Sequence, residues 1–436
     1  PANMELWIDT SSVPHTLKQY SATSKAWTQI ATTYVKISAP GIAENFKQYD
    51  AVKISGFPEE SKQLSEMNDI TYPLWEAYHD PSNEANDYIV IVGLLDEAVT
   101  YESNLQIERT MPIMDFIVES GNRLYGCHYG VAANGQVVNE FYASKLGDFK
   151  NWNCSMSIST DSWVGGVGTD GQFTGAITHM GYPLFFKENC VHKVYGNYPA
   201  NFQIQTTACR GVQKGCHRSL AIVNEILYYK STQGICAYDG SLPTEVSYAL
   251  GDVAYDSAVA GAIGSKYYVS MRDVNAVTDK YRLFVYDAAK GMGHKEDNTQ
   301  AVQFEAYKGN LYYIDYGDSN KIKSVRYEDG QAKEIDSVKW MAQTGIIGVD
   351  DPDKKYISAL SIRMMLDFDT PVRVFIEYDS CGELEQIYVK TADKLSSISV
   401  PLRPKRCDHF RLRIEGEGMA KIFSICKTIM KGSASR

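Results

Sequence analysis

The chain has 436 residues, of which 44% are hydrophobic and 22% charged, and its formal net charge is −10. This composition is that of a globular protein, and the length allows about two to four domains. The acidic balance opposes an outward-facing surface that coats nucleic acid through clustered Lys and Arg, although it leaves room for a local basic patch. The densest basic stretch, residues 403–406 followed by Arg411 and Arg413, favours a solvated surface. A long uncharged apolar run is lacking, so no transmembrane helix is predicted.

The cysteines indicate a reducing compartment. There are nine, at positions 127, 154, 190, 209, 216, 236, 381, 407 and 426. An odd number with wide spacing, in a chain without a basic and apolar secretion leader, favours free thiols over a disulfide framework. Because the sequence opens at Pro1 and not at Met, we expect further residues upstream.

The first part of the chain divides into two β units. Residues 1–33 contain a strand, a turn and an aromatic strand, "MELWIDTSSVPHTLKQYSATSKAWTQI". Residues 34–110 repeat the short sequence "VKIS" and contain the strand-like run "DYIVIVG", so they predict a small separate β domain. Helical periodicity is scarce, and the best amphipathic candidate is the stretch from Ser219 to Asn224.

An internal repeat follows. Apolar-aromatic strands, each followed by a polar turn and a second strand, recur with adjacent aromatic residues at a spacing of about 39 to 45 residues. The aromatic pairs are Phe185-Phe186, Tyr228-Tyr229, Tyr267-Tyr268 and Tyr312-Tyr313. This is the period of a four-stranded propeller blade. We therefore predict a β-propeller over residues 1–33 and 111–348, interrupted by the small β domain at 34–110, with residues 1–33 as a first blade or the part that closes the ring.

The pattern changes after the linker "GVDDPDKKY" at 348–356. Six short strand-like runs follow within residues 355–436, including "VRVFIEYDS" and "HFRLRIEG". Evenly spaced short strands in such a segment predict a C-terminal β-sandwich. The predicted fold class is all-β.

Several short motifs could carry chemistry, and each has a structural alternative. "STDSWVGG" at 159–166 approaches the Asp-box of sialidases but lacks its glycine and places Trp163 too early. Metal ligation would have to use Cys190, His192, Cys209, Cys216 and His217, whose spacing fits no standard zinc site. "DDPD" at 350–353 lacks the glycine and glutamate of a calcium loop, and a solvated linker explains it better.

Two glycine-containing stretches also invite a functional interpretation. "WVGGVGTDGQFTG" at 163–175 lacks the features of a nucleotide loop and predicts a connection between blades. Gly147 and Asp148 in "VNEFYASKLGDFKNW" predict a tight turn that Asp148 caps, with Trp152 as a buried anchor. The residues alone therefore predict no catalytic, cofactor-binding or metal site, no cofactor, and no enzyme.

These motifs resemble a known family. "NRLYGC" at 122–127, "VNEFYASKLGDFKNW" at 138–152 and "DGQFTGAITHMGYPLFFKEN" at 170–189 resemble tail- and neck-associated β-propeller proteins of tailed bacteriophages and prophages. The segments "SIRMMLDFDTPVRVFIEYDSCGELEQIY" and "VPLRPKRCDHFRLRIEGEG" resemble the C-terminal sandwich of prophage versions from gut Firmicutes. The resemblance covers most of the chain from about residue 115 onward.

The resemblance implies a virion structural protein of the tail or neck, similar to nozzle or packaged-DNA stabilisation proteins. The implied partners are further copies of the chain in a ring around the DNA exit path, other tail or portal and adaptor proteins, and passively touched DNA. The resemblance also implies that the protein is made in the cytoplasm of the bacterial host and then becomes part of the virion. An acidic lumen would suit sliding DNA, because like charges repel. Since propellers also bind glycans and proteins, a receptor- or glycan-binding propeller at the tail tip is the alternative, and a glycosidase a more distant one.

Overall fold

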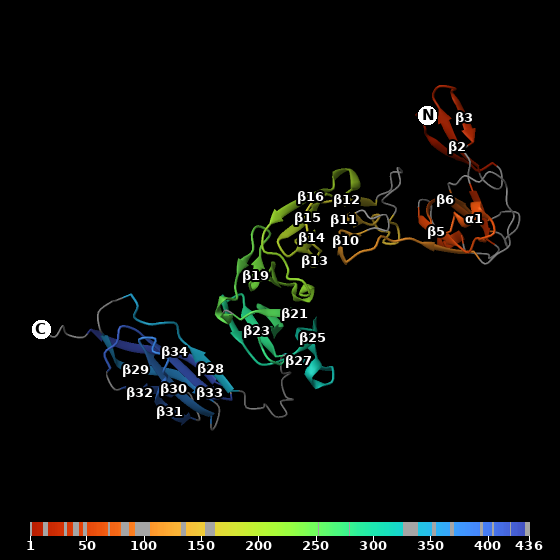
Figure 1. The fold of residues 1–436 in the computed structure, drawn as a ribbon. Helices are drawn as coiled ribbons and strands as arrows, with labels where there is room; N and C mark the ends of the chain where they lie inside the picture. Colours follow the sequence, from red (N-terminus) through yellow and green to blue (C-terminus); the bar gives the residue numbers. More distant parts are fainter. Residues whose placement is uncertain are drawn as a thin grey trace. The chain divides into compact units, whose positions relative to one another are not determined.

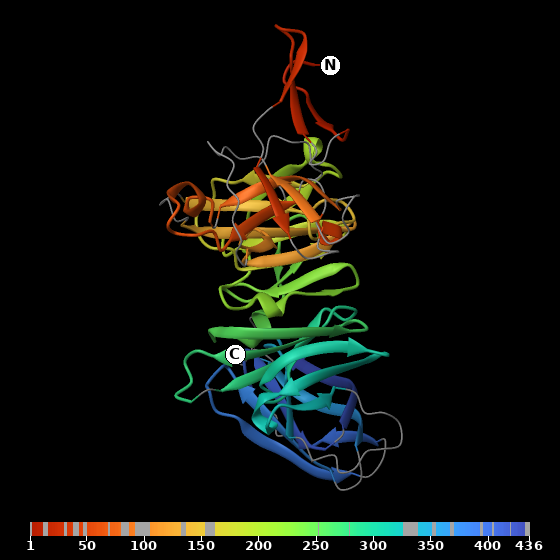
Figure 2. The ribbon, with the colours of Figure 1, turned by 90° about the vertical axis from the view of Figure 1, so that its right-hand side faces the viewer.

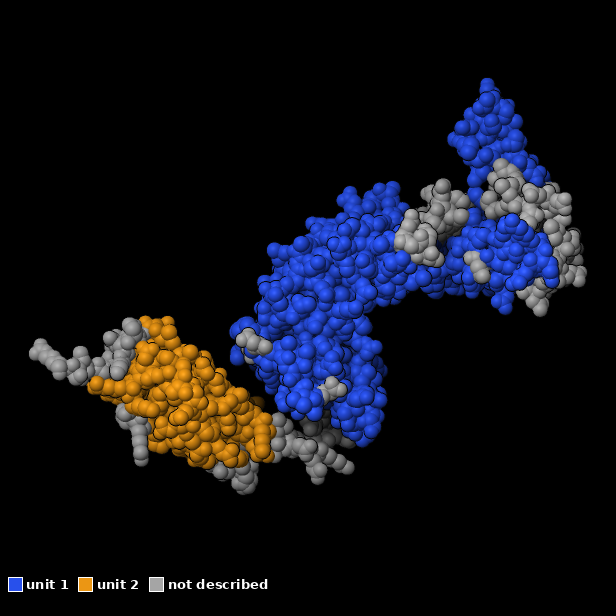
Figure 3. All heavy atoms as spheres, in the orientation of Figure 1, with its two compact units in different colours: residues 1–326 blue, residues 327–436 orange. Residues whose placement is uncertain are grey.

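The structure is a computed structural model that describes residues 2–11, 16–29, 33–37, 43–46, 50–68, 70–79, 87–91, 105–131, 137–152, 162–251, 253–278, 280–325, 339–350, 355–366, 370–392, 396–402, 405–418 and 420–431. The chain forms two compact units, residues 1–326 and residues 327–436 (Figure 3). Nearly all regular elements are strands (Figure 1). The all-β prediction is confirmed.

Two small sheets lie at the start of unit 1. The first has three antiparallel strands, β1 (Leu6–Asp9), β2 (Thr16–Ser21) and β3 (Ala26–Gln29). The second has five strands in the order β4-β7-β6-β5-β8, with α1 (Lys62–Ser65) between β5 and β6. Its strands are β4 (Thr33–Ile37), β5 (Ala51–Ser55), β6 (Thr71–His79), β7 (Asp87–Ile91) and β8 (Gln106–Arg109). A core of its own, which includes Val52, Ile54 and Leu74, makes this second sheet a separate β module.

Five antiparallel sheets of the blade type follow along the chain (Figure 2). Each has its strands in sequence order, as a propeller blade requires. The first two comprise β9 (Phe116–Ser120), β10 (Arg123–Val131), β11 (Val137–Ala143) and β12 (Trp163–Gly166), then β13 (Gly175–His179), β14 (Tyr182–Lys187), β15 (Cys190–Tyr195) and β16 (Gln203–Ala208).

The remaining blades continue the same topology. The third comprises β17 (Ala221–Val223), β18 (Ile226–Lys230), β19 (Ile235–Tyr238) and β20 (Thr244–Glu245), and the fourth β21 (Tyr255–Ile263), β22 (Lys266–Asp273), β23 (Tyr281–Asp287) and β24 (Met292–Lys295). The fifth has three described strands, β25 (Ala301–Tyr307), β26 (Asn310–Asp315) and β27 (Lys321–Ser324). First strands of neighbouring blades lie against each other, β9 with β13, β17 with β21, and β21 with β25.

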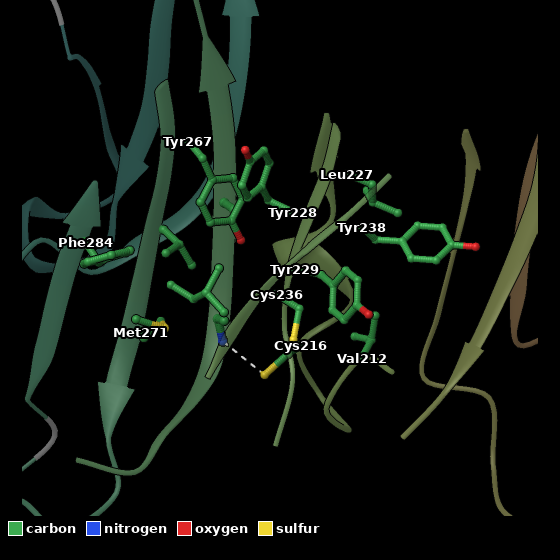
Figure 4. Close-up of a cluster of buried hydrophobic side chains, with 14 of the residues drawn as sticks. Val212, Cys216, Leu227, Tyr228, Tyr229, Cys236, Tyr238, Tyr267, Met271 and Phe284 are labelled. Atoms are coloured by element: carbon green, nitrogen blue, oxygen red, sulfur yellow. Dashed lines mark hydrogen bonds between the residues drawn. The ribbon is translucent and has the colours of Figure 1, made fainter. Parts of the chain in front are cut away.

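The four predicted aromatic pairs all lie on the second strands of their blades, β14, β18, β22 and β26. Because successive side chains of a strand point to opposite faces, the two members of a pair face different neighbours. Phe185 contacts Phe141 of the first blade, at 5.0 Å between ring centroids, while Phe186 contacts Tyr229 of the third. Tyr228 in turn stacks on Tyr267 of the fourth blade at 5.4 Å (Figure 4). The repeat is therefore the contact surface between blades.

Two sequence predictions inside the blades are wrong. The amphipathic stretch Ser219 to Asn224 is not a helix, because strand β17 runs through it beside β18 and only a 3₁₀ turn, His217–Ser219, precedes it. The start of the glycine stretch at 163–175 is not a connection, because Trp163–Gly166 pairs with β11 as the fourth strand of the first blade. Gly165 leaves room for the Trp163 ring, because a Cβ atom there would lie 2.4 Å from that ring.

Unit 2 is a β-sandwich. One sheet has the order β28-β33-β30-β31 and the other β32-β29-β34. Their strands are β28 (Lys339–Gln343), β29 (Lys355–Leu366), β30 (Thr370–Tyr378), β31 (Glu385–Ala392), β32 (Ser396–Val400), β33 (Phe410–Glu417) and β34 (Ala420–Lys431). Both sheets supply one shared apolar core, with Ile362 from one and Phe410 from the other fully buried. The fold class predicted from the sequence, propeller blades with an inserted β module and a C-terminal sandwich, is confirmed.

Candidate functional site

A lysine, a cysteine and a histidine lie close together in the second blade. Strand β14 ends at Lys187 and β15 begins at Cys190, so that the two residues face each other in the register of the sheet. The period of two along β15 places His192 on the same side as Cys190. The Cys190 Sγ atom lies 3.5 Å from Nε2 of His192, and the imidazole is fully buried. The geometry is thus that of a thiol beside an imidazole.

Both nitrogens of the His192 ring have hydroxyl partners. Nε2 lies 3.1 Å from Oγ1 of Thr169, and Nδ1 lies 2.8 Å from Oγ1 of Thr206. The ring also meets Phe141 edge-on at 5.3 Å between centroids. His192 thus contacts three segments: Thr169 in the connection before β13, Thr206 in β16, and Phe141 in the neighbouring first blade.

Lys187 is the third member of the cluster. Its Nζ donates hydrogen bonds to Oδ1 of Asn139 at 3.0 Å and to the carbonyl oxygen of Thr169 at 2.8 Å. The same ammonium lies 4.7 Å from the centroid of the Phe173 ring, a cation–π distance. The hydrogen bonds and the aromatic face replace the water that burial removes.

The electrostatics of the cluster oppose nucleophilic chemistry. Burial raises the pKa of the Cys190 thiol, and burial together with the nearby Lys187 lowers the pKa of His192 to about 4. A reactive cysteine needs the opposite arrangement, a thiolate stabilised by an imidazolium or another cation. At neutral pH both groups are therefore uncharged, and the cluster stabilises the contact between two blades.

The other residues considered for metal ligation, Cys209, Cys216 and His217, do not gather into a metal site. Cys216 is buried and accepts a hydrogen bond from the backbone N–H of Ala258 at 3.5 Å (Figure 4), whereas the adjacent His217 is exposed near Phe116. Within the described ranges, no group of three His, Cys, Asp or Glu side chains is placed to hold a metal ion. The "DDPD" linker after Asp350 and the start of the Asp-box-like stretch, residues 159–161, lie outside the described residues.

The Gly-Asp turn is a joint within the first blade. Gly147 adopts φ +69°, which favours glycine, and its N–H donates to the carbonyl oxygen of Asn122 at 3.0 Å. Asp148 accepts a hydrogen bond from the N–H of Lys150 at 3.3 Å, as expected of a turn-capping side chain. Trp152 is buried as predicted, with Nε1 donating to the carbonyl oxygen of Phe149 at 2.7 Å.

Three described cations in and after the basic C-terminal stretch, Lys405, Arg411 and Arg413, have partners inside the sandwich. Residues 403 and 404 lie outside the described part of the chain. The ammonium of Lys405 lies 4.7 Å from the centroid of the Tyr378 ring. Arg411 pairs with Glu377, and Arg413 with Glu415, each at 3.5 Å. Among the residues that the structure describes, no helix is long and apolar enough to cross a membrane.

A scan against protein-family models and a search of curated proteins found no match to the chain. Among solved structures, an exo-β-1,3-galactanase from Phanerochaete chrysosporium is 11% identical, with a TM-score of 0.28 over 72% of this chain and 95% of that one. The dihydro-heme d1 dehydrogenase NirN is 11% identical, with a TM-score of 0.31 over 91% of this chain and 76% of that one. A Bombyx mori GH32 β-fructofuranosidase is 8% identical, with a TM-score of 0.20 over 72% of this chain and 89% of that one.

Proposed function

We propose that the chain is a structural protein of a tailed-bacteriophage virion, located in the tail or neck. In this role it forms a ring of identical copies around the DNA exit path, contacts portal, adaptor or tail proteins, and stabilises packaged DNA. No catalytic step is part of the proposal. It rests on the resemblance of residues 122–127, 138–152 and 170–189 to such proteins.

The observation that carries the proposal is the use that the fold makes of these motif residues. Arg123 donates through Nη1 to the carbonyl oxygen of Ser144 at 2.8 Å, and the Ser144 hydroxyl accepts from the N–H of Leu124 at 3.0 Å. Asn122 holds the Gly147 turn. The motifs that resemble phage proteins therefore build a joint and a blade interface, which supports a structural role for them over a catalytic one.

The charge of the chain is consistent with this role. At −10, the chain repels the DNA phosphates instead of gaining affinity by releasing counterions. A ring that lets DNA pass must not bind it tightly. Arg411 and Arg413, which follow the basic stretch, pair with glutamates and so add little free positive charge.

Labelling of intact virions tests the proposal directly. An antibody raised against the full chain should decorate one end of the tail or the neck of particles from the phage that encodes it. Cryo-electron microscopy of the purified chain, alone and mixed with the portal and adaptor proteins encoded beside it, should show a closed ring. A chain that stays monomeric under all these conditions and labels no particle would refute the proposal.

A further inference from the structure

An open groove lies between the fourth and fifth blades, away from the Cys190 cluster. Its volume is about 500 Å³, in the range of small-ligand sites. Three segments line it: the start of β23, the connection that leads into β25, and the end of β26 with β27. The lining residues used below are Lys280, Tyr281, Asn298, Gln300, Tyr313 and Lys323.

One side of the groove is fixed by an ion-pair network. Lys323 contacts Asp315 at 2.7 Å and Asp318 at 3.2 Å, and Asp315 also accepts a hydrogen bond from the N–H of Gly317 at 3.0 Å. The ammonium of Lys323 therefore forms ion pairs with two carboxylates of the protein. Lys321 also pairs with Asp318 at 3.0 Å, so two ammonium groups balance two carboxylates and this wall is preorganised without a net charge.

Three further polar side chains of the groove are available to a ligand. No side-chain hydrogen bond joins Lys280, Asn298 or Gln300 to another described residue. Two carboxamides and an ammonium supply both donors and acceptors. Adjacent hydroxyl groups of a sugar present donors and acceptors at a spacing that a planar carboxamide can bridge.

The groove has no net charge, because Lys280 and Lys323 are matched by Asp297 and Asp315. A phosphate or nucleic-acid site would need an excess of cations. Tyr281 and Tyr313 add aromatic surface, and Tyr313 is held by Phe304 at 5.6 Å between ring centroids. The aromatic rings can pack against apolar C–H groups of a ligand, and the side-chain amides of Asn298 and Gln300 can form hydrogen bonds with its polar edges. A pyranose has both kinds of surface.

We infer that this groove binds an uncharged saccharide of one or two sugar units. The ligand packs against Tyr281 and Tyr313 and is oriented by hydrogen bonds from Asn298, Gln300 and Lys280. The inference is independent of the proposed ring, since the groove lies within one copy of the chain. A ring that binds no sugar and a monomer that does are therefore distinguishable results.

Saturation-transfer NMR on the full chain provides the test. The probes are glucose, galactose, rhamnose, N-acetylglucosamine, N-acetylgalactosamine and their β-linked disaccharides. We expect at least one to bind saturably. The double variant Asn298→Ala/Gln300→Ala should weaken that binding at least tenfold while keeping the melting temperature of the wild type. The matched control Gln303→Ala/Glu305→Ala, exposed on β25 outside the groove lining, should bind as the wild type does.

Three results would overturn the inference. They are a panel in which no sugar binds, binding that survives unchanged in the Asn298→Ala/Gln300→Ala variant, and displacement of the sugar by inorganic phosphate. The last would show that the groove selects an anion through Lys280, contrary to its balanced charge.

Discussion

Phe186 and Tyr229 occupy equivalent positions in consecutive blades, and their rings meet at 5.2 Å between centroids and an interplanar angle of 51°. Both side chains are fully buried. The hydroxyl of Tyr229 also donates to the carbonyl oxygen of Arg210 at 2.5 Å, in the connection between the two blades. One pair of rings therefore joins two sheets and the segment between them.

This contact should appear as a coupling energy. In a double-mutant cycle with Phe186→Leu and Tyr229→Leu, we expect the two changes to interact by about 0.5–1.5 kcal/mol, because an aromatic pair contributes beyond its buried area. Urea unfolding of the four proteins measures it. The same cycle between Phe186→Leu and Phe410→Leu, in a separate core of the sandwich, should be additive. If the effects of Phe186→Leu and Tyr229→Leu also simply add, the two rings do not interact.

Tyr267 is buried completely, and its hydroxyl donates to the carbonyl oxygen of Ser219 at 2.7 Å. Tyr267→Phe keeps the ring but leaves that buried carbonyl without this donor, which should lower the free energy of unfolding by about 1–3 kcal/mol. Tyr307→Phe, at a residue that is 59% exposed, should change it by less than about 0.5 kcal/mol. Denaturant titration compares the two variants. Equal stabilities would contradict the buried hydrogen bond.

Trp152 is the anchor that follows the Gly-Asp turn, and only 3% of it is exposed. Trp152→Ala removes a buried indole and should destabilise the protein by about 3–5 kcal/mol. Trp7→Ala is the control and should destabilise the protein less than Trp152→Ala, because 46% of Trp7 is exposed. Thermal unfolding followed by circular dichroism measures both. A Trp152→Ala protein that melts like the wild type would show that the indole is not buried.

His192 should make stability depend on pH. Its folded pKa of about 4 lies below the ordinary value of 6.5, so between these values the unfolded chain binds a proton that the folded protein excludes. The stabilisation is present above pH 6.5 and is lost as the pH falls toward 4, amounting to about 2 kcal/mol between pH 7.5 and pH 5.

The variant His192→Gln isolates this contribution, because glutamine does not titrate. Urea unfolding at a series of pH values should show a shallower loss of stability in the variant than in the wild type. Parallel pH profiles would mean that the imidazole is protonated in the folded protein and that burial does not lower its pKa.

Exposed and buried cysteines should react with a thiol reagent at different rates. Cys381 and Cys426 are exposed and should react within the mixing time. Cys127, Cys216 and Cys236 are buried with raised pKa values, so these thiols should react only after unfolding. Cys209 is half-buried and its pKa is raised to about 11, so it should react more slowly than the exposed thiols. Mass spectrometry of labelled peptides in a Cys154→Ser background reads out the result. Fast labelling of Cys127 would contradict the packing of the first blade.

The blades could be predicted because their contacts are periodic in the sequence. Aromatic pairs such as Tyr228-Tyr229 recur on the second strands of four blades, since both faces of such a strand pack against neighbours. Local amphipathicity was misleading at Ser219–Asn224, where pairing with β18 decides that residues 221–223 form a strand. Propensity over a few residues is weaker than a ladder of hydrogen bonds to a neighbouring strand. The predicted domain boundaries and the phage assignment stay predictions.

The sequence by itself determined the all-β class, the blade repeat and the change to a sandwich, because these depend on side-chain alternation along each strand. Only the tertiary structure decided what the polar residues do. Cys190 and His192 become neutral partners because burial by surrounding blades sets their pKa values. The groove at Tyr281, Gln300 and Tyr313 draws on three segments, and no spacing along the chain encodes their meeting. A strand pattern is local, whereas a site depends on which strands become neighbours.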